Sequence, residues 1–348
     1  MKAIVYEGVG KINLREVEKP KLRKDNVIVK IKSCAICGTD YKAYMIGISS
    51  IKPPVILGHE FVGEIVEIGE KIQGFNVGDR VTMATTIPCG HCDMCIKGYP
   101  NLCRNKMPIG TYINGAFAEY LEVPWEGIVH GNLIKVPDHL SDDNGAIAEP
   151  LGCAINSQNI ASVGFPDIVA VIGAGPLGII HAELAKSRGA AKVILIQRSK
   201  KRYELAKSFN IDYTICSELE NPVDKVMELT AGKGVDVVIN AAPSKDAVKL
   251  AFKIVSKTGR ISLFASVPKN DPLVDIDVNF IHYNQISVFG SSDSTAKNHR
   301  DAVDLLASGK INAEKLITHK LPLSDFFKGI EAIKNREALK VVIKPNPL

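Results

Sequence analysis

The feature that most constrains the fold is a glycine-rich turn between an apolar run and a helical segment. The apolar residues Ile168–Ile172 lead directly into Gly173–Gly178, which reads GAGPLG and fits the pattern G-x-G-x-x-G. In that pattern the first glycine permits a tight turn, the second lets a pyrophosphate approach the backbone, and the third lets the helix pack closely against the strand. The helix N-terminus adds free N–H groups and a favourable dipole. A glycine turn without a ligand is the alternative; we expect a dinucleotide to contact Gly173, Gly175, Pro176, Leu177 and Gly178.

A regular alternation of strands and helices follows this turn. Val/Ile-rich runs alternate with helical segments, which indicates a parallel sheet covered by helices on both faces. The predicted buried strands are Ile168–Ile172, Lys192–Ile196, Val235–Asn240 and Arg260–Phe264. Upstream of them, a helix is predicted from Ser141, a suitable N-cap, to about Val163. The pattern predicts an α/β fold with a Rossmann-type, doubly wound parallel sheet.

The chain has 348 residues, too many for one ordinary core, so we expect two domains. The N-terminal part is β-rich, with short alternating runs such as Val27–Lys32 and Gly63–Ile68 between Gly and Pro residues. The strand-like segment Lys340–Lys344 is expected to return to this first domain. The predicted domains are a β-rich domain of residues 1–150 and 291–348 and, inserted into it, the Rossmann domain of residues 151–290.

The residues after the second predicted strand bear on the choice between NAD and NADP. An acidic residue there would bind the ribose 2′-OH of NAD, but this chain has Gln197, followed by the basic run Arg198–Arg202 (RSKKR). Without a carboxylate a 2′-phosphate is not repelled, and guanidinium groups bind phosphate bidentately. A solvent-facing basic turn, with Gln197 serving NAD, is the alternative. NADP is therefore favoured over NAD, with contacts expected from Gln197, Arg198, Ser199 and Arg202.

Four cysteines on one short loop predict a structural metal site. They have the spacing C-x2-C-x2-C-x7-C within residues 86–104, and they are Cys89, Cys92, Cys95 and Cys103. Four thiolates can close tetrahedrally around zinc and leave no open position. An iron–sulfur cluster is a minor alternative, because it also takes four thiolates.

A second set of metal-ligand residue types is spread along the chain. It consists of Cys37, His59, Glu60 and Glu149. One thiolate, one imidazole and carboxylates can bind zinc while leaving a position for substrate or water. We therefore expect two zinc ions per chain.

Three of these motifs, in this order, resemble the medium-chain zinc dehydrogenases. The run Gly58–Gly63 (GHEFVG), with Gly69 six residues on, is similar to the zinc signature of that family; the four-cysteine loop and Gly173–Gly178 are similar to its structural-zinc lobe and cofactor fingerprint. Cys37–Asp40 (CGTD) and Glu149–Leu151 (EPL) are most similar to the sorbitol/polyol and threonine dehydrogenase branch. The resemblance implies a GroES-like catalytic domain and a catalytic zinc held by Cys37, His59 and either Glu60 or Glu149.

One position departs from that branch. A histidine commonly stands two residues after the aspartate of the CGTD-type motif and ends a proton relay, but this chain has Lys42. Thr39 is retained and is expected to accept the alcohol proton, while Asp40 is expected to orient a zinc ligand. Lys42 either faces solvent, passes the proton outward or binds an anionic group of the substrate.

The expected reaction is oxidation of a secondary alcohol of a polyol, sugar alcohol or sugar-alcohol phosphate to its ketone with NAD(P). Lys42 and Lys52 are candidate partners for a phosphate group. Two alternatives stay open: oxidation of an amino alcohol, as in L-threonine 3-dehydrogenases, and a non-catalytic dinucleotide-binding module. The second alternative predicts a missing zinc ligand, and all four candidates are present.

Composition limits the partners. Hydrophobic residues make up 46% and charged residues 23%, no apolar run is long enough for a membrane helix, and the start has no secretion-signal pattern. The net charge of +5 is spread along the chain without the basic and aromatic stripes of a nucleic-acid binder. We expect a cytoplasmic enzyme, a homo-oligomer (dimer or tetramer) with a small-molecule substrate and no nucleic-acid or membrane partner. The eight cysteines then favour metal sites over disulfides.

Overall fold

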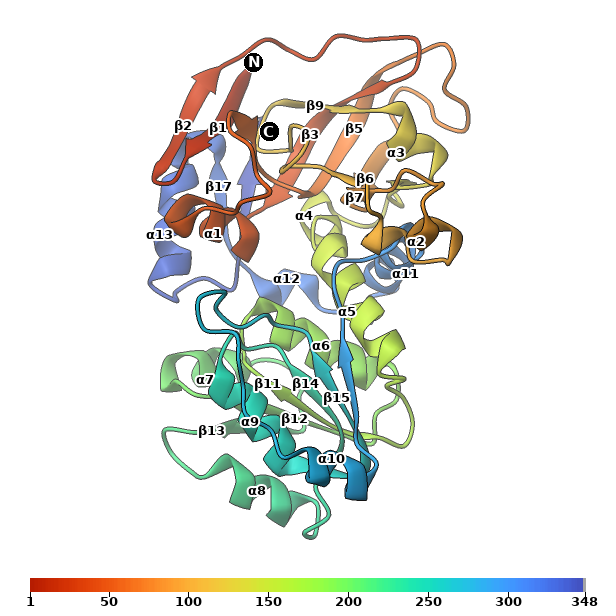
Figure 1. Cartoon of the computed structure of the whole chain (residues 1–348). Coiled ribbons are helices and arrows are strands. Elements are labelled where there is room, and N and C mark those ends of the chain that lie inside the picture. The colour runs from red at the N-terminus through yellow and green to blue at the C-terminus, as the bar shows by residue number, and fades with distance from the viewer. Residues whose placement is uncertain (347–348) are drawn as a thin grey trace. The chain divides into compact units, whose positions relative to one another are not determined.

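The computed structural model describes residues 1–346, and the chain divides into two compact units (Figure 1). Unit 1 comprises Met1–Cys153 and the described residues from Asp293 onward, and unit 2 comprises Ala154–Ser292. Within residues 1–346, no helix combines the length and the apolar character needed to cross a bilayer.

Unit 1 is built on a seven-stranded sheet. Its strands are, in spatial order, β10 (Leu133–Lys135), β6 (Arg80–Met83), β5 (Glu60–Ile68), β3 (Val27–Ala35), β18 (Lys340–Lys344) and β17 (Ile317–Pro322), with β9 (Tyr120–Val123) paired to β3. The smaller sheets are β2 (Lys11–Glu16), β1 (Lys2–Gly8), β4 (Val55–Ile56) and, separately, β7 (Thr86–Ile87) with β8 (Met107–Pro108). The strands of the large sheet are rich in Val and Ile, which suit a half-buried pleated surface.

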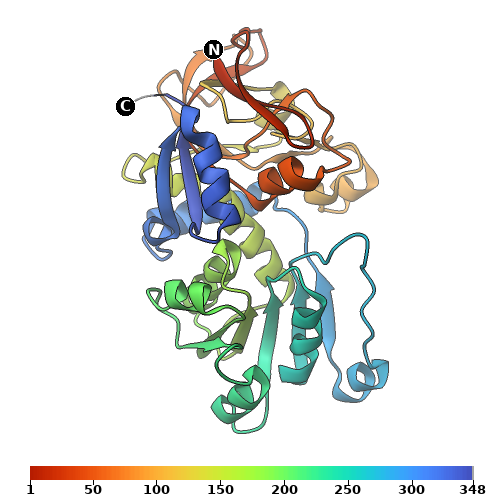
Figure 2. The same cartoon turned by 90° about the vertical axis from the view of Figure 1, so that its left-hand side faces the viewer.

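The late strand β18 lies inside this sheet, beside the early strand β3. Val342 of β18 is paired with Ala35 of β3, and α13 (Phe326–Lys334) packs on β17 and β18, as the blue segment of Figure 2 shows. The aromatic rings of Phe117 and Phe326 meet edge to face in the core, with centroids 5.0 Å apart. The C-terminal segment is therefore part of the core of unit 1.

The helices of unit 1 are short. They are α1 (Gly38–Ile46), α2 (Asp93–Ile96), η1 (Pro100–Leu102), α3 (Trp125–Val129), α4 (Asp142–Gly145), α11 (Ala296–Ala307), α12 (Ala313–Leu316), η2 (Leu323–Asp325) and α13. The single helix predicted from Ser141 to about Val163 is wrong in extent. Ser141 does cap a helix, since its side chain accepts a hydrogen bond from the Asn144 N–H, but α4 ends at Gly145 and a separate helix α5 (Ala148–Ile160) follows. Glycine is a weak helix former, and Gly145 packs against Val62.

Unit 2 holds a six-stranded parallel sheet. Its spatial order is β13 (Tyr213–Cys216), β12 (Lys192–Gln197), β11 (Ile168–Ile172), β14 (Val235–Asn240), β15 (Val255–Leu263) and β16 (Ser287–Gly290). Its helices are the C-terminal part of α5, α6 (Pro176–Ser187), α7 (Lys200–Ala206), α8 (Pro222–Leu229), α9 (Lys245–Ile254) and α10 (Val278–Asn284). Helix α6 packs on β11 and β12, and α9 packs on β14 and β15.

The strand order reverses between β11 and β14, because the chain first builds outward on one side of β11 and then on the other. Ligands of open parallel sheets bind at the carboxyl ends of the strands at such a reversal. The glycine-rich turn begins at the carboxyl end of β11, so the fold places it at this point.

Candidate active site

The four cysteines of the predicted lobe come together around one point. The Cys92 sulfur lies 3.5 Å from that of Cys95 and 3.8 Å from that of Cys103, and the Cys103 and Cys89 sulfurs are 3.5 Å apart. Four sulfurs at 2.3 Å from a tetrahedral zinc are about 3.8 Å apart. The set therefore fits a closed zinc site.

The electrostatics of this lobe also favour a cation. Backbone N–H groups from Arg104 and Cys95 lower the pKa of the Cys92 thiol to about 6, whereas burial and the neighbouring thiols raise the pKa of Cys95 to about 12. Without a cation, the loop thus stabilises the Cys92 thiolate but disfavours a state in which all four thiols are ionised at once. His91 is exposed and its Nδ1 lies 2.8 Å from the Cys89 carbonyl oxygen, outside the four-sulfur group.

Cys37, His59 and Glu60 form a second group, with one ligand atom from each within 4.8 Å of the others. Cys37 is the N-cap of α1 and follows β3, and His59 and Glu60 stand at the start of β5. Gly58 has a φ of 92°, and a Cβ there would lie 2.8 Å from the backbone nitrogen of Phe117. This turn therefore needs glycine to place His59.

Negative groups surround the imidazole of His59. Burial alone would lower its pKa, but Cys37, Asp40 and Glu149 together raise it well above the ordinary value. The buried Nδ1 of His59 and the buried Oε1 of Glu60 make no hydrogen bond within the described residues. Unpartnered buried polar atoms are costly, so this group also fits a bound cation.

The residues of the predicted relay lie on α1. Asp40 is buried; its Oδ2 accepts a hydrogen bond of 2.9 Å from the Cys37 N–H, and its Oδ1 lies 3.8 Å from His59 Nδ1. Thr39 is half-buried in the first turn of the helix, and Lys42 is exposed. Lys52 is exposed and lines a groove of about 750 Å³ whose lining includes none of Cys37, His59 and Glu60.

Glu149 belongs to a neighbouring group with Cys153 and Asp293, again with ligand atoms within 4.8 Å. Thr85 donates a hydrogen bond of 3.1 Å to Glu149, and the Cys153 thiol lies 3.6 Å from the same oxygen. Burial raises the pKa of Glu149 to about 7. The Cys153 thiol therefore faces two carboxylates and is not in apolar surroundings. Sequence spacing gave no indication of Asp293, which is 144 positions from Glu149 (293 − 149).

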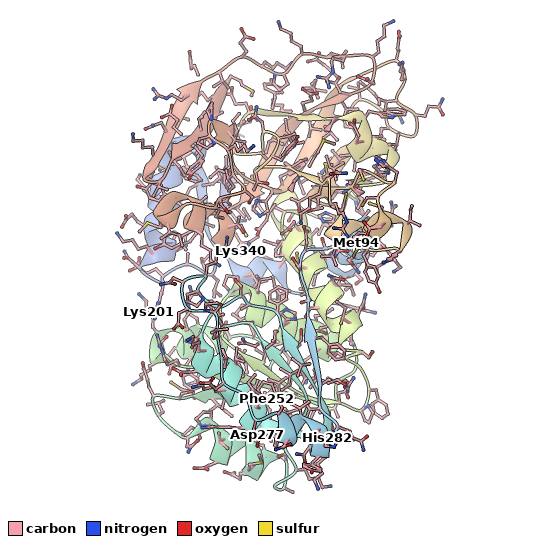
Figure 3. All side chains as sticks on the ribbon, in the orientation of Figure 1. Met94, Lys201, Phe252, Asp277, His282 and Lys340 are labelled. Atoms are coloured by element: carbon pink, nitrogen blue, oxygen red, sulfur yellow. The ribbon has the colours of Figure 1, made fainter. Side chains whose placement is uncertain are left out.

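Lys340 is a site residue that sequence reasoning missed. Its ammonium forms a buried ion pair with Glu60 Oε2, and its position in unit 1 is labelled in Figure 3. Burial would lower the pKa of Lys340, but the charges of Glu60 and Cys37 raise it. In an apolar strand a terminal lysine normally points to solvent, so only the register of the sheet reveals this contact.

The glycine-rich turn has the geometry that its pattern predicts. Gly173 has a φ of 108°, and a Cβ on Gly178 would lie 1.6 Å from the Gly173 carbonyl oxygen. Gly175 is the N-cap of α6, a Cβ there would meet no atom within 4 Å, and Pro176 occupies the first turn beside Leu177. Open space at Gly175 and free N–H groups at the helix start suit a phosphate group.

Gln197 connects this turn to the basic segment that follows β12. Its Oε1 accepts a hydrogen bond of 2.8 Å from the Ala174 N–H, and its Nε2 donates one of 3.1 Å to the Ser199 hydroxyl. Arg198 is exposed, and Arg202 is half-buried on α7. One acidic residue contacts this segment: Glu218 accepts a hydrogen bond of 3.0 Å from the Lys200 N–H.

Comparison with known proteins identifies the family. Residues 23–138 match the family described as alcohol dehydrogenase GroES-like domain, and residues 176–308 match the zinc-binding dehydrogenase family. The chain is 36% identical over 352 residues to the sorbitol dehydrogenase of Halalkalibacterium halodurans, covering 99% of both chains. The chain belongs to the medium-chain zinc alcohol dehydrogenase family. It is an oxidoreductase that acts on CH–OH groups, and its fold combines a GroES-like domain with a Rossmann domain, which confirms the predicted family and fold class.

Other relatives span the same branch of the family. The L-threonine 3-dehydrogenase of Bacillus licheniformis is 33% identical over 350 residues, with 99% of each chain covered. A solved zinc-binding dehydrogenase from Sinorhizobium meliloti 1021 bound to NADP is 31% identical, with a TM-score of 0.91 and 99% of each chain covered. Family membership supports zinc and a nicotinamide cofactor.

Proposed function

We propose that this chain is a zinc-dependent dehydrogenase that converts a secondary alcohol of a polyol or sugar alcohol into its ketone, with NADP preferred to NAD. The observation that carries the proposal is the group of Cys37, His59 and Glu60. One thiolate, one imidazole and one carboxylate are the donor set that leaves zinc an open position. The similarity to a sorbitol dehydrogenase over 99% of the chain supports the substrate class.

The chain's own residues would position and deprotonate the alcohol. A zinc ion held by Cys37 and His59, with Glu60 or Glu149, would polarise the substrate oxygen, and a nicotinamide bound by unit 2 would accept the hydride. Thr39 takes the hydroxyl proton as the first member of a relay. Asp40 fixes the orientation of His59 and, through the Cys37 N–H, the start of α1. The exposed Lys42 continues the relay toward water.

The NADP preference rests on the segment after β12. Because Gln197 is neutral and hydrogen-bonded to Ala174, no carboxylate there opposes a 2′-phosphate. The exposed Arg198 and the half-buried Arg202 are the guanidinium groups proposed to bind it. Ser199 supplies a hydroxyl beside them. An R198A variant should weaken NADP binding and leave NAD binding unchanged; equal weakening of both would contradict this assignment.

A phosphorylated substrate has less support than an uncharged one. Lys52 lines a groove that shares no lining residue with the Cys37 group, which leaves Lys42 as the candidate anion partner. Two further acidic residues, Glu149 and Asp293, belong to the neighbouring group, and their negative charge disfavours a phosphate. We therefore place neutral polyols before sugar-alcohol phosphates.

A substrate panel tests the function. Sorbitol and other polyols, their phosphates, and L-threonine are offered with NADP and with NAD, and dinucleotide reduction is followed by absorbance. Turnover of polyols with NADP supports the proposal. Turnover of threonine alone would overturn it in favour of the amino-alcohol reaction, which the similarity to an L-threonine 3-dehydrogenase also supports.

Zinc content distinguishes the enzyme from a non-catalytic dinucleotide-binding module. We propose two zinc ions per chain, one at the cysteine lobe and one at the Cys37 group, and metal analysis of the purified protein should find about two. About one zinc per chain, with no activity on the panel, would support the binding module. We also propose a cytoplasmic homo-oligomer. This is consistent with the eight cysteines, none of which forms a disulfide within residues 1–346, and with the frequency of closed oligomers among such enzymes.

A further inference from the structure

The contact between Lys340 and Glu60 depends on the register of three strands. Ala35 of β3 is paired with Glu60 of β5 on one side and with Val342 of β18 on the other. Residues paired directly across strands project from the same face of a sheet, and so do residues two apart on one strand. Lys340 therefore shares the face of Glu60, and the small side chain of Ala35 lets the lysine reach across β3.

The pair is buried on both sides. The side chain of Glu60 is 0% exposed and that of Lys340 is 5% exposed. Two charges buried in this way are costly to desolvate and repay the cost only when their geometry is good. Packing alone therefore does not explain why a lysine is buried at this position.

The two oxygens of Glu60 have different roles. Oε2 is bound by the Lys340 ammonium, while the buried Oε1 makes no hydrogen bond within residues 1–346. One oxygen of this carboxylate lies within 4.8 Å of ligand atoms of Cys37 and His59, and Oε1 is the oxygen that Lys340 leaves available. A carboxylate oriented in this way offers one oxygen to a cation and is prevented from turning both toward it.

We propose that Lys340 is a positioning residue for the catalytic metal: it fixes the Glu60 carboxylate so that Oε1 faces the ion held by Cys37 and His59. This inference rests on the proposed function. Lys340 acts through Glu60 and touches neither the ion nor the substrate. Residues that bind a metal ligand in this way orient the ligand toward the metal.

The test is metal affinity in matched variants. Zinc remaining per chain is counted after equilibration with graded concentrations of a chelator, for wild type, K340M, E60Q and the double variant. We expect K340M to weaken one of the two zinc sites by about 10–100-fold, the usual effect of losing a partner of a metal ligand. E60Q should weaken the same site, and the double variant should be no weaker than E60Q alone, because Lys340 acts through Glu60.

The matched control is K344M. Lys344 lies on the same strand and pairs with a different carboxylate, Asp143, so its loss removes an ion pair at another place. That pair is less buried than Lys340–Glu60, and Asp143 keeps Lys320 as a second partner. We expect zinc binding by K344M to equal that of wild type. Cobalt substitution adds a spectroscopic readout: the visible bands of cobalt at the Cys37 group should shift in K340M and not in K344M.

Three outcomes would overturn the inference: unchanged zinc affinity in K340M, equal weakening in K344M, or additive effects of K340M and E60Q. If K340M does not fold, K340R decides, because arginine keeps the charge and should retain zinc and most of the cobalt spectrum; loss of both would contradict the inference. Failure of the proposed function is recognised separately, since wild type would then hold about one zinc or oxidise no polyol.

Discussion

His181 is a wholly buried imidazole on α6. Its Nδ1 lies 3.3 Å from the Gln158 side-chain nitrogen, and its ring stands edge-on to Phe264 with centroids 4.5 Å apart. Burial lowers the pKa of His181 to about 3. The ring is therefore neutral in the folded protein above about pH 3.

This burial predicts an acid sensitivity. In the unfolded chain the His181 side chain takes up a proton near pH 6.5, whereas in the folded chain it stays neutral. The contribution of His181 to the free energy of unfolding is therefore complete above about pH 6.5 and declines as the pH falls. In H181L that decline is absent. The unfolding free energy of wild type should fall relative to that of H181L by roughly 3 kcal/mol between pH 7 and pH 4.

Urea unfolding of both proteins across this pH range measures the effect. Comparing the two proteins cancels contributions from zinc release and from other groups, including the buried His299. A difference that stays constant with pH would show that His181 gains a proton in the folded protein.

Single residues show where sequence reasoning succeeds and where it stops. Cys89, Cys92, Cys95 and Cys103 could be grouped from spacing alone, because a short loop keeps them close. Lys340 could not be connected to Glu60, because their contact spans 280 positions and depends on the pairing of three strands. Spacing likewise gave no reason to bring Asp293 to Cys153.

The turn from β11 into α6 is the element most sensitive to added bulk. A Cβ on Gly178 would overlap the Gly173 carbonyl oxygen, which is backbone and cannot move aside, whereas a Cβ on Gly175 would meet no atom. We expect G178A to lower the free energy of unfolding by at least about 2 kcal/mol.

The matched variant G175A separates folding from binding. It should unfold at nearly the wild-type urea concentration, yet bind NADP more weakly because a methyl group then stands where the pyrophosphate approaches the backbone. Urea unfolding and fluorescence titration with NADPH measure the two effects. Equal stability of G178A and G175A would contradict the close packing of strand and helix at this turn.

At the level of elements, long Val/Ile runs were predictable as strands and four-residue strands were not. β11 and β14 have the predicted bounds, because a buried parallel strand needs continuous apolar residues. β13 (Tyr213–Cys216) and β16 (Ser287–Gly290) contain strand-forming residues but are only four residues each and partly exposed, which is too short for a recognisable pattern. β15 begins at Val255, five residues before the predicted Arg260. Val255 pairs with Val235, and the register then shifts so that Arg260 pairs with Val237, with Thr258 at a φ of 60° in the irregular stretch between them.

The two units differ in how their chains are connected. Unit 2 is one continuous segment with its own six-stranded sheet and apolar core. Unit 1 needs two segments, since β18 pairs with β3.

This difference predicts how fragments behave. Residues 148–292, which keep all of α5 and the whole parallel sheet, should unfold cooperatively in urea when produced alone. Residues 1–153 should not, because β3 keeps β5 and β9 but loses β18, and the core loses α13. Circular dichroism during urea titration of each fragment measures this. A non-cooperative transition in residues 148–292 would mean that unit 2 depends on unit 1.

The position of β18 also orders events during translation. Glu60 leaves the ribosome 280 residues ahead of the lysine that neutralises it, an interval of about 14–56 s at about 5–20 residues per second. All of unit 2, which ends at Ser292, is synthesised before Lys340. Chains terminated between residues 293 and 339 are therefore expected to contain a complete unit 2 and a Glu60 carboxylate that is still hydrated because its lysine partner is missing.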